Sequence, residues 1–272
     1  MTPPDEPNSS GFVIRTFLNK AAWDKGFRLA REAEGSWLAF DSTTANGRVW
    51  LAGDGEHGPW RLASDHPGVL AEFGPGAMAG GPGLATWRFA DQADLYEALD
   101  RAYKLGASLP DAPLREFERQ TAGLPRATEV ERLVVQRVGQ DVFRAALMDY
   151  WDGRCAVTGL ADPALLRASH IVRWADCATD AERLDVHNGL LLSALWDAAF
   201  DAHLVTFDEE GRAKFGSDIS TEARAMLGGE AKMCRTPTPQ QRGYLGRHRA
   251  FGAVDDGSGL ECERFLASEE ER

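Results

Sequence analysis

The chain has 272 residues, 43% of them hydrophobic and 26% charged, with a formal net charge of −12. This composition is typical of a globular protein with one large or two ordinary domains. No apolar run approaches the roughly 20 residues of a membrane span, and the polar start does not resemble a secretion signal, so we expect a cytoplasmic protein without a membrane partner. The acidic charge balance excludes binding of nucleic acid through bulk positive charge, although it allows a local basic surface.

The first 107 residues are predicted to form a small, mostly antiparallel β-rich α+β domain. Short apolar segments alternate with turn residues, and the candidate strands are 36–40, 48–52 and 58–65. Asn46-Gly47 is a strong turn signal between the first two strands. A Gly/Ala/Pro loop at 73–85 then precedes a segment, 90–105, with the apolar spacing of a helix.

A connector and a second domain are expected after this part. Residues 108–127 contain three prolines among polar residues and are predicted to be a linker with one short helix. Thr128 and Glu131 match a capping box, which predicts that one or two packed helices begin there. Their apolar residues at helical spacing are Leu133, Val134, Val138, Phe143, Leu147 and Tyr150. We place the second domain at 128–255 and a solvated acidic tail at 256–272.

The four cysteines are widely spaced and form no Cys-x-x-Cys pair: they are Cys155, Cys177, Cys234 and Cys262. The spacing indicates neither a disulfide framework nor a four-cysteine zinc site. We therefore expect structural thiols and no structural zinc.

A strand, a loop, a second strand and a helix are predicted between residues 165 and 204. Segment 165–174 alternates as a strand and places His170 among apolar neighbours, and Asn188 lies in a turn before the second strand. Asp197 and Asp201 then fall on one face of an alanine-rich helix. Each residue alone also has an ordinary explanation: a core histidine, a turn asparagine and an aspartate at a helix end.

Together these groups suit hydrolysis of a phosphodiester bond. A neutral imidazole can take the proton of an attacking water, and carboxylate oxygens suit a divalent cation that neutralises phosphate charge. Two carboxylates four residues apart on a helix repel each other by a few tenths of a kcal/mol, and a bound cation would reverse this repulsion.

The runs "GRCAVTG", "SHIVRW" and "HNGLLLSALWDAAFDAHLVTFDEEG", with "RVGQDVFRAALMDYW" before them and "YLGRHRAF" after them, resemble the HNH endonuclease family over about 128–252. The resemblance implies a C-terminal ββα-metal (HNH) nuclease domain with flanking helices. It also implies a metal-dependent endonuclease that acts on duplex DNA with Mg²⁺ or Mn²⁺, in restriction of foreign or modified DNA. Cutting of both strands would call for a homodimer, whereas a monomer with one site would nick.

The resemblance assigns roles to individual residues. His170 matches the general base, and Asn188 matches the asparagine that holds the loop and orients the base. Asp197 lies where the family often has its last histidine, and Asp201 matches a family aspartate, so both are candidate metal ligands. Further candidates for contact with metal or phosphate are Ser169, His187 and His203, although His187 also fits a solvated loop residue.

Four arginines surround the motif and are candidates for contact with DNA phosphates: Arg154, Arg167, Arg173 and Arg183. Simple solvation of these side chains remains the other interpretation.

Several alternatives stay open at the level of sequence. Ser169 stands where many relatives carry an acidic or histidine ligand, which suggests a degenerate HNH-fold protein that binds DNA or a partner without cutting. A nuclease that acts on RNA or as a toxin is a third hypothesis. Five tryptophans lie in the first part, where they either stack a modified base and give this domain a targeting role or build its core: Trp23, Trp37, Trp50, Trp60 and Trp87.

Overall fold

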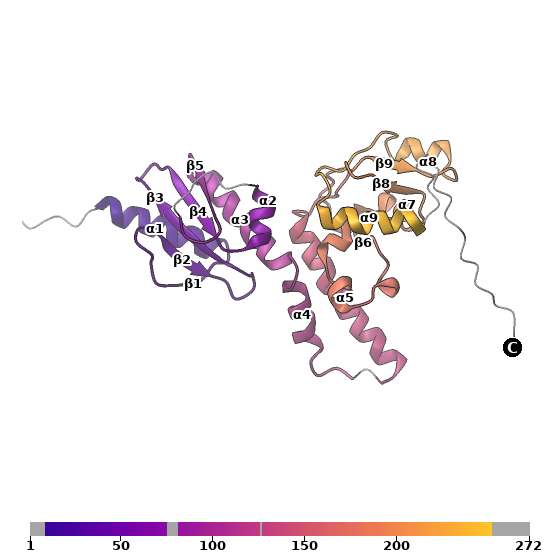
Figure 1. Ribbon diagram of the computed structural model, residues 1–272, viewed down its shortest axis with the longest axis horizontal. Helices are drawn as coiled ribbons and strands as arrows, with labels where there is room; N and C mark the ends of the chain where they lie inside the picture. The colour runs from indigo at the N-terminus through magenta and orange to yellow at the C-terminus, as the bar shows by residue number, and fades with distance from the viewer. Residues whose placement is uncertain (1–8, 75–80, 126, 252–272) are drawn as a thin grey trace, which may run out of the picture.

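The computed structural model describes residues 9–74, 81–125 and 127–251. The fold is α+β, with a sheet and helices in the first part and small hairpins packed between helices in the second (Figure 1). The predicted mixed α+β class with antiparallel sheets is therefore confirmed. The predicted acidic tail and part of the loop 73–85 lie outside the described residues.

The first part contains a five-stranded antiparallel sheet with the strand order β1-β2-β3-β4-β5. Its strands are β1 (Leu29–Ala30), β2 (Leu38–Asp41), β3 (Arg48–Gly53), β4 (Trp60–Ser64) and β5 (Ala85–Phe89). The register pairs Leu51 with Leu62 and Leu62 with Trp87, so these side chains share one buried face. The predicted meander is confirmed, and β1 and β5 extend it at its two edges.

Helices α1 (Ser9–Asp24), α2 (Pro67–Phe73) and α3 (Gln92–Ser108) belong to the same part of the chain (Figure 1). Leu18 of α1 and Leu95 of α3 are buried in the same apolar cluster as Leu51 and Leu62 of the sheet. The predicted elements of this part included the strands and the helix at 90–105 but missed α1 and α2. The signal for α1 is present in the sequence. The partly or fully buried residues of this helix recur at helical spacing: Ile14, Phe17, Leu18 and Ala21.

Four of the five tryptophans in this part are buried, with exposed fractions of 8% or less: Trp37, Trp50, Trp60 and Trp87. Trp23 is 60% exposed, and the Arg28 guanidinium lies 5.6 Å from its ring. For the four buried rings the structure therefore favours a role in the core over an open pocket that stacks a base.

The second part begins with α4 (Ala112–Thr121) and the 22-residue helix α5 (Glu129–Tyr150). The capping box is present, since Thr128 and Glu131 exchange side-chain and backbone hydrogen bonds. The expectation that Leu133 and Val134 pack in the core was wrong, because the first turns of α5 extend beyond the body of the protein (Figure 1) and leave these side chains 57% and 49% exposed.

The hairpin of β6 (Leu166–His170) and β7 (Gly189–Ser193) lies between α5 and α7 (Ala194–Asp201). The Ser169 hydroxyl reaches Asp201 of α7, whereas Gly189 lies against Phe143 of α5. The predicted strand 165–174 was too long, because the chain leaves the sheet after His170 and the Val172 N–H donates to the side chain of Asn188 instead.

The remaining elements follow this hairpin. They are α6 (Asp180–Arg183) in the loop between β6 and β7, then β8 (Val205–Phe207), β9 (Ala213–Phe215), α8 (Thr221–Met226) and α9 (Pro239–Phe251). No helix in the described part of the chain is long and apolar enough to cross a membrane.

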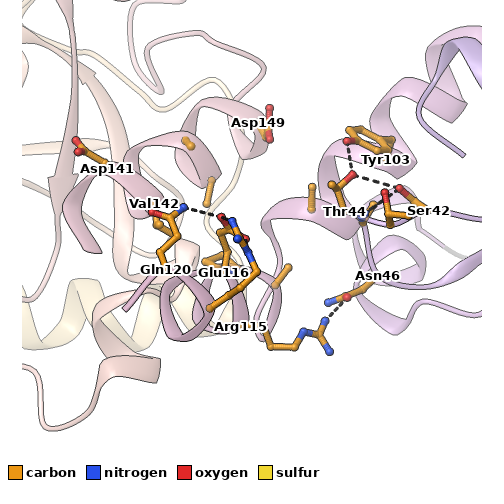
Figure 2. Close-up of a pocket in the computed structure, with 18 residues that line it drawn as sticks. Ser42, Thr44, Asn46, Tyr103, Arg115, Glu116, Gln120, Asp141, Val142 and Asp149 are labelled. Atoms are coloured by element: carbon orange, nitrogen blue, oxygen red, sulfur yellow. Dashed lines mark hydrogen bonds and ion pairs between the residues drawn. The ribbon is translucent and has the colours of Figure 1, made fainter. Parts of the chain in front are cut away.

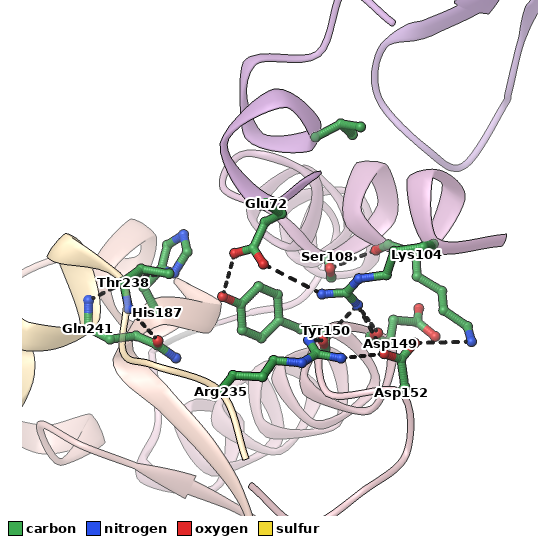
Figure 3. A network of polar contacts seen from close by, with 12 residues as sticks. Glu72, Lys104, Ser108, Asp149, Tyr150, Asp152, His187, Arg235, Thr238 and Gln241 are labelled. Atoms are coloured by element: carbon green, nitrogen blue, oxygen red, sulfur yellow. Dashed lines mark hydrogen bonds and ion pairs between the residues drawn. The ribbon is translucent and has the colours of Figure 1, made fainter. Parts of the chain in front are cut away.

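A polar network around the end of α5 joins the two parts of the chain (Figure 3). The Tyr150 hydroxyl donates to Glu72 of α2 at 2.7 Å, and the Tyr150 carbonyl accepts from Arg101 of α3 at 2.8 Å and from Arg235 at 3.0 Å. Burial, and then the Glu72 carboxylate, raise the pKa of Tyr150, so its hydroxyl stays a donor. The first part is thus attached directly to the helix that lies under the hairpin.

Replacement of Gly189 by alanine is expected to destabilise the protein by about 1–3 kcal/mol, the usual cost of overpacking a core. A Cβ atom at this position would lie 2.5 Å from Phe143 Cζ and 2.8 Å from Leu147 Cδ1. Urea denaturation of wild type and Gly189→Ala measures the loss. Gly123→Ala is the control, because this residue lies outside the helices and strands and an added Cβ there meets no atom within 4 Å. A midpoint of Gly189→Ala equal to that of wild type would contradict the packing.

Candidate active site

His170 is the last residue of β6, and one hydrogen bond to the main chain fixes its ring. Its Nε2 lies 2.9 Å from the carbonyl oxygen of Arg183. Since a carbonyl can only accept, Nε2 carries the proton and Nδ1 carries the lone pair. Nδ1 makes no hydrogen bond with any described residue, so it is available to a water molecule.

The surroundings of His170 keep it neutral. Its ring stacks on Phe143 with centroids 3.8 Å apart, and Trp174 meets it edge-on at 5.7 Å. Burial lowers the pKa of His170 below its usual 6.5, and the hydrogen bond to Arg183 offsets this only in part. A neutral imidazole with a free ring nitrogen can act as a general base at pH 7.

Asn188 is fully buried and holds together the loop between β6 and β7. Its Oδ1 accepts from Val172 N at 2.8 Å, while its Nδ2 donates to the carbonyls of Val172 and Glu182, both at 3.2 Å. The successive carbonyls of Glu182 and Arg183 therefore accept from Asn188 and from His170. This geometry supports the loop-holding role that the sequence suggested for Asn188.

The two aspartates of α7 form a separate group with Ser169. The Ser169 hydroxyl donates a long hydrogen bond of 3.4 Å to Asp201 Oδ1. Burial raises the pKa of Asp201, and the nearby charge of Asp197 raises it further. A cation bound beside these carboxylates would relieve their mutual repulsion.

His203 and Arg173 lie next to these carboxylates, and both of them lower the pKa of Asp201. The Arg173 guanidinium donates to His203 Nε2 at 3.1 Å, and the ring of His248 lies 4.4 Å from that of His203. His203 has a φ of 55°, a value that glycine adopts far more easily. Burial, and then His203, lower the pKa of His248 to about 4, so its buried ring stays neutral.

The donor set fits a hard divalent cation with few protein ligands. Asp197 and Asp201 offer carboxylate oxygens, and Mg²⁺ is commonly held by one or two carboxylates plus waters. Across the described ranges, no group of three or more His, Cys, Asp or Glu side chains is arranged to hold a metal ion. Two carboxylates completed by water and substrate oxygens therefore describe the site better than a closed protein cage.

Ser169, which contacts Asp201 of α7, and His170 are successive residues of β6, and their side chains lie on opposite faces of the hairpin. Ser169 faces α7 and the aspartates, while His170 faces Phe143 of α5. Because His170 ends β6, a phosphate at the end of this strand could be approached from both faces.

The predicted DNA-contacting arginines differ in how they are used. Arg154, Arg167 and Arg173 are exposed at the surface. Arg183 instead donates to the carbonyls of Trp174 and Cys177 and pairs with Asp180. Its guanidinium thus stabilises the loop from within, which leaves the other three arginines as candidates for phosphate contacts.

The interpretation of His187 as a solvated loop residue was wrong. The side chain is 6% exposed, its Nδ1 lies 3.3 Å from Thr238 Oγ1, and its ring meets that of Tyr150 at 5.6 Å (Figure 3). His187 is buried by residues of α5 and of the segment before α9. Both segments are distant in the sequence, so the residues around His187 could not indicate its burial.

The thiols contribute to packing in this region. Cys155 and Cys177 are buried and free, and Cys234 is free and exposed; Cys262 lies outside the described residues. Cys155 Sγ accepts backbone hydrogen bonds from Thr158 and Ser193, which attaches the start of the motif to the end of β7.

A cavity of about 900 Å³ lies elsewhere, between the loop after β2, α3, α4 and α5 (Figure 2). Its lining includes Thr44, Tyr103 and Asn46 on one side and Glu116 and Asp149 on the other. None of the candidate site residues lines it.

Sequence reasoning gave no role to Tyr244 and Arg247 of α9, although the segment "YLGRHRAF" lies inside the predicted domain. The structure places both side chains on the loop that orients His170. The only local signal is that each pair of partners, Glu182 with Asp185 and Tyr244 with Arg247, is spaced three residues apart.

Comparison with known proteins gives one family match. Residues 155–208 match the model of a family described as HNH endonuclease. The matched segment contains β6, the following loop, β7, α7 and β8, and therefore both the His170 and the Asp201 groups. No curated protein matches the chain.

Proposed function

From the premise that residues 155–208 are an HNH endonuclease segment, we propose that the protein is a metal-dependent endonuclease that hydrolyses phosphodiester bonds in duplex DNA. The observation that carries this proposal is the state of His170: a neutral ring, fixed at Nε2 by the Arg183 carbonyl, with Nδ1 free.

In this mechanism His170 Nδ1 takes the proton of the attacking water. The Arg183 carbonyl keeps the second proton on Nε2, and the stacked Phe143 ring prevents rotation of the imidazole. Asn188 holds the loop that supplies this carbonyl. The arrangement fixes both the tautomer and the direction of the base, which is what efficient proton transfer requires.

Asp197 and Asp201 would hold the divalent ion, Mg²⁺ or Mn²⁺. Such an ion neutralises charge on the phosphate and on the leaving oxygen. Arg173, with its exposed guanidinium beside this pair, would contact a neighbouring phosphate, and Arg154 and Arg167 would extend the contact along the backbone.

We also propose that two domains of the chain have different roles. Residues 1–107 would form a targeting or regulatory domain and 128–255 the nuclease domain, joined by 108–127. The separate sheet of the first part and its attachment to α5 support this division. Restriction of foreign or modified DNA would then depend on recognition by the first domain.

Incubation of plasmid DNA with purified protein tests the function. We expect cleavage with Mg²⁺ or Mn²⁺ and none with EDTA, because the carboxylates alone cannot neutralise a phosphate. Parallel plasmids with and without modified cytosine or adenine test the targeting role. Equal cleavage of modified and plain plasmids would contradict recognition of modified DNA while leaving the nuclease itself intact.

A second candidate function is binding without cleavage. Ser169 and Asp197 replace side chains that commonly bind metal in this family, and the described residues hold no three-ligand group. Calorimetry with Mn²⁺ separates the two functions. The absence of Mn²⁺ binding, together with retained DNA binding, would favour the non-cleaving protein.

A further inference from the structure

The loop 171–188 is called here the orienting loop, because its Arg183 carbonyl fixes the ring of His170. Within this loop, Glu182 and Asp185 flank Arg183. Glu182 accepts from the backbone N–H of Ala178 at 2.7 Å, and Asp185 accepts from that of His187 at 2.9 Å. One oxygen of each carboxylate is therefore used to shape the orienting loop itself.

The other oxygen of each carboxylate is held by α9. Arg247 forms an ion pair with Glu182 Oε1, and the Tyr244 hydroxyl donates to Asp185 Oδ2 at 3.1 Å. Tyr244 and Arg247 are three residues apart and therefore lie on one face of α9. Glu182 is only 17% exposed despite its charge.

α9 is itself firmly anchored, so it can serve as a fixed support. Its buried residues are Gln241, Leu245 and His248. His248 lies 3.0 Å from Thr206 Oγ1 of β8, and its Nε2 donates to the carbonyl of Phe200 in α7 at 3.2 Å. α9 thus connects the element that carries the aspartates with the loop that fixes the base.

We infer that Tyr244 and Arg247 are positioning residues for His170, acting through Asp185 and Glu182 on the Arg183 carbonyl. The inference rests on the proposed role of His170 and adds to it. α9, at 239–251, lies outside the segment that matches the HNH family.

The test compares Tyr244→Phe/Arg247→Met with wild type. Both substitutions keep the bulk of the side chain and remove only its polar group. Arg242→Met is the matched control, because Arg242 lies on α9 but its side chain forms no hydrogen bond or ion pair with the orienting loop among the described residues. ¹⁵N NMR of the His170 ring reports its tautomer, and plasmid cleavage gives kcat and KM.

In wild type we expect a His170 ring protonated at Nε2. In the double variant we expect mixed tautomers and a kcat about tenfold lower, because the base is present but spends time misoriented. KM and Mn²⁺ affinity should stay within about twofold, since neither the aspartates nor the DNA contacts change. The single variant Arg247→Lys keeps a positive charge that can pair with Glu182. Its kcat should therefore lie close to that of wild type and well above that of the double variant.

An unchanged tautomer and an unchanged kcat in the double variant would overturn the inference, and so would an equal effect of Arg242→Met. If wild type cleaves no substrate, the proposed function fails, but the NMR measurement still decides whether α9 fixes the ring. If the double variant does not fold, Tyr244→Phe alone provides the same comparison through the hydrogen bond to Asp185.

Discussion

Replacement of His170 by alanine is expected to reduce DNA cleavage by about 100- to 10,000-fold, the usual contribution of a positioned general base. The variant loses the ring nitrogen Nδ1, which stays unprotonated because the Arg183 carbonyl holds the proton on Nε2. DNA affinity should change little, since no hydrogen bond joins His170 to the exposed arginines among the described residues. Single-turnover cleavage and a DNA-binding titration measure the two effects separately.

His57→Ala is the control for this substitution, because His57 is an exposed histidine of the first part. It should cleave like wild type. Circular dichroism of His170→Ala shows whether the loss of stacking on Phe143 unfolds the hairpin. A folded His170→Ala protein that cleaves at the wild-type rate would remove His170 from the mechanism.

The same assignment predicts the pH dependence of wild-type cleavage. A general base works only in its neutral form, and burial lowers the pKa of His170 below 6.5 in the folded protein. Titration of His170 should therefore not affect the cleavage rate near pH 7. The rate should fall as the pH drops below 6.5, through the lowered pKa of His170, because the protonated ring cannot act as a base. A half-maximal rate above pH 7 would indicate a different base.

Replacement of Asp201 by asparagine is expected to have the second largest effect, a loss of divalent metal binding and of at least about 100-fold in cleavage, since a catalytic cation stabilises the transition state by several kcal/mol. Asparagine keeps the shape of the side chain and a partner for Ser169 but removes the charge. Thermal unfolding with and without Mn²⁺ provides a measurement that does not depend on activity.

Relative to wild type, Asp201→Asn should be more stable without metal and less stable with Mn²⁺. Without metal, Asp201→Asn should be more stable by about 0.2–0.5 kcal/mol, because it removes the repulsion from Asp197 that raises the pKa of Asp201. With Mn²⁺ at about 100 times its Kd, wild type should gain about 2.7 kcal/mol and the variant nothing. Glu209→Gln, an exposed charge removed elsewhere, should keep the full gain. Equal stabilisation of wild type and Asp201→Asn by Mn²⁺ would place the metal at other ligands.

Helix α5 explains how the first part of the chain contacts the site. Phe143 lies under the ring of His170, and Tyr150, two turns later, is held by Glu72 and Arg101 of the first part. His170 and the first part of the chain thus both contact one continuous helix.

The sequence alone determined the features that depend on local interactions. The capping box of Thr128 and Glu131 begins α5 because both hydrogen bonds are made within one turn of helix. Asn188 and the alternation before His170 place the hairpin, and the spacing of Asp197 and Asp201 puts both carboxylates on α7. The match of residues 155–208 to the HNH family agrees with this reading of the motif.

Only the tertiary structure decided which of these groups meet. Ser169 and His170 are neighbours in sequence, yet packing of the hairpin between α7 and α5 sends one toward Asp201 and the other toward Phe143. Burial of His187 and the internal use of Arg183 depend on partners supplied by distant segments or by the folded loop. The support of the orienting loop by Tyr244 and Arg247 joins residues about 60 positions apart. Such contacts depend on how distant segments pack together and bury their side chains. The local spacing of apolar and polar residues does not contain this information.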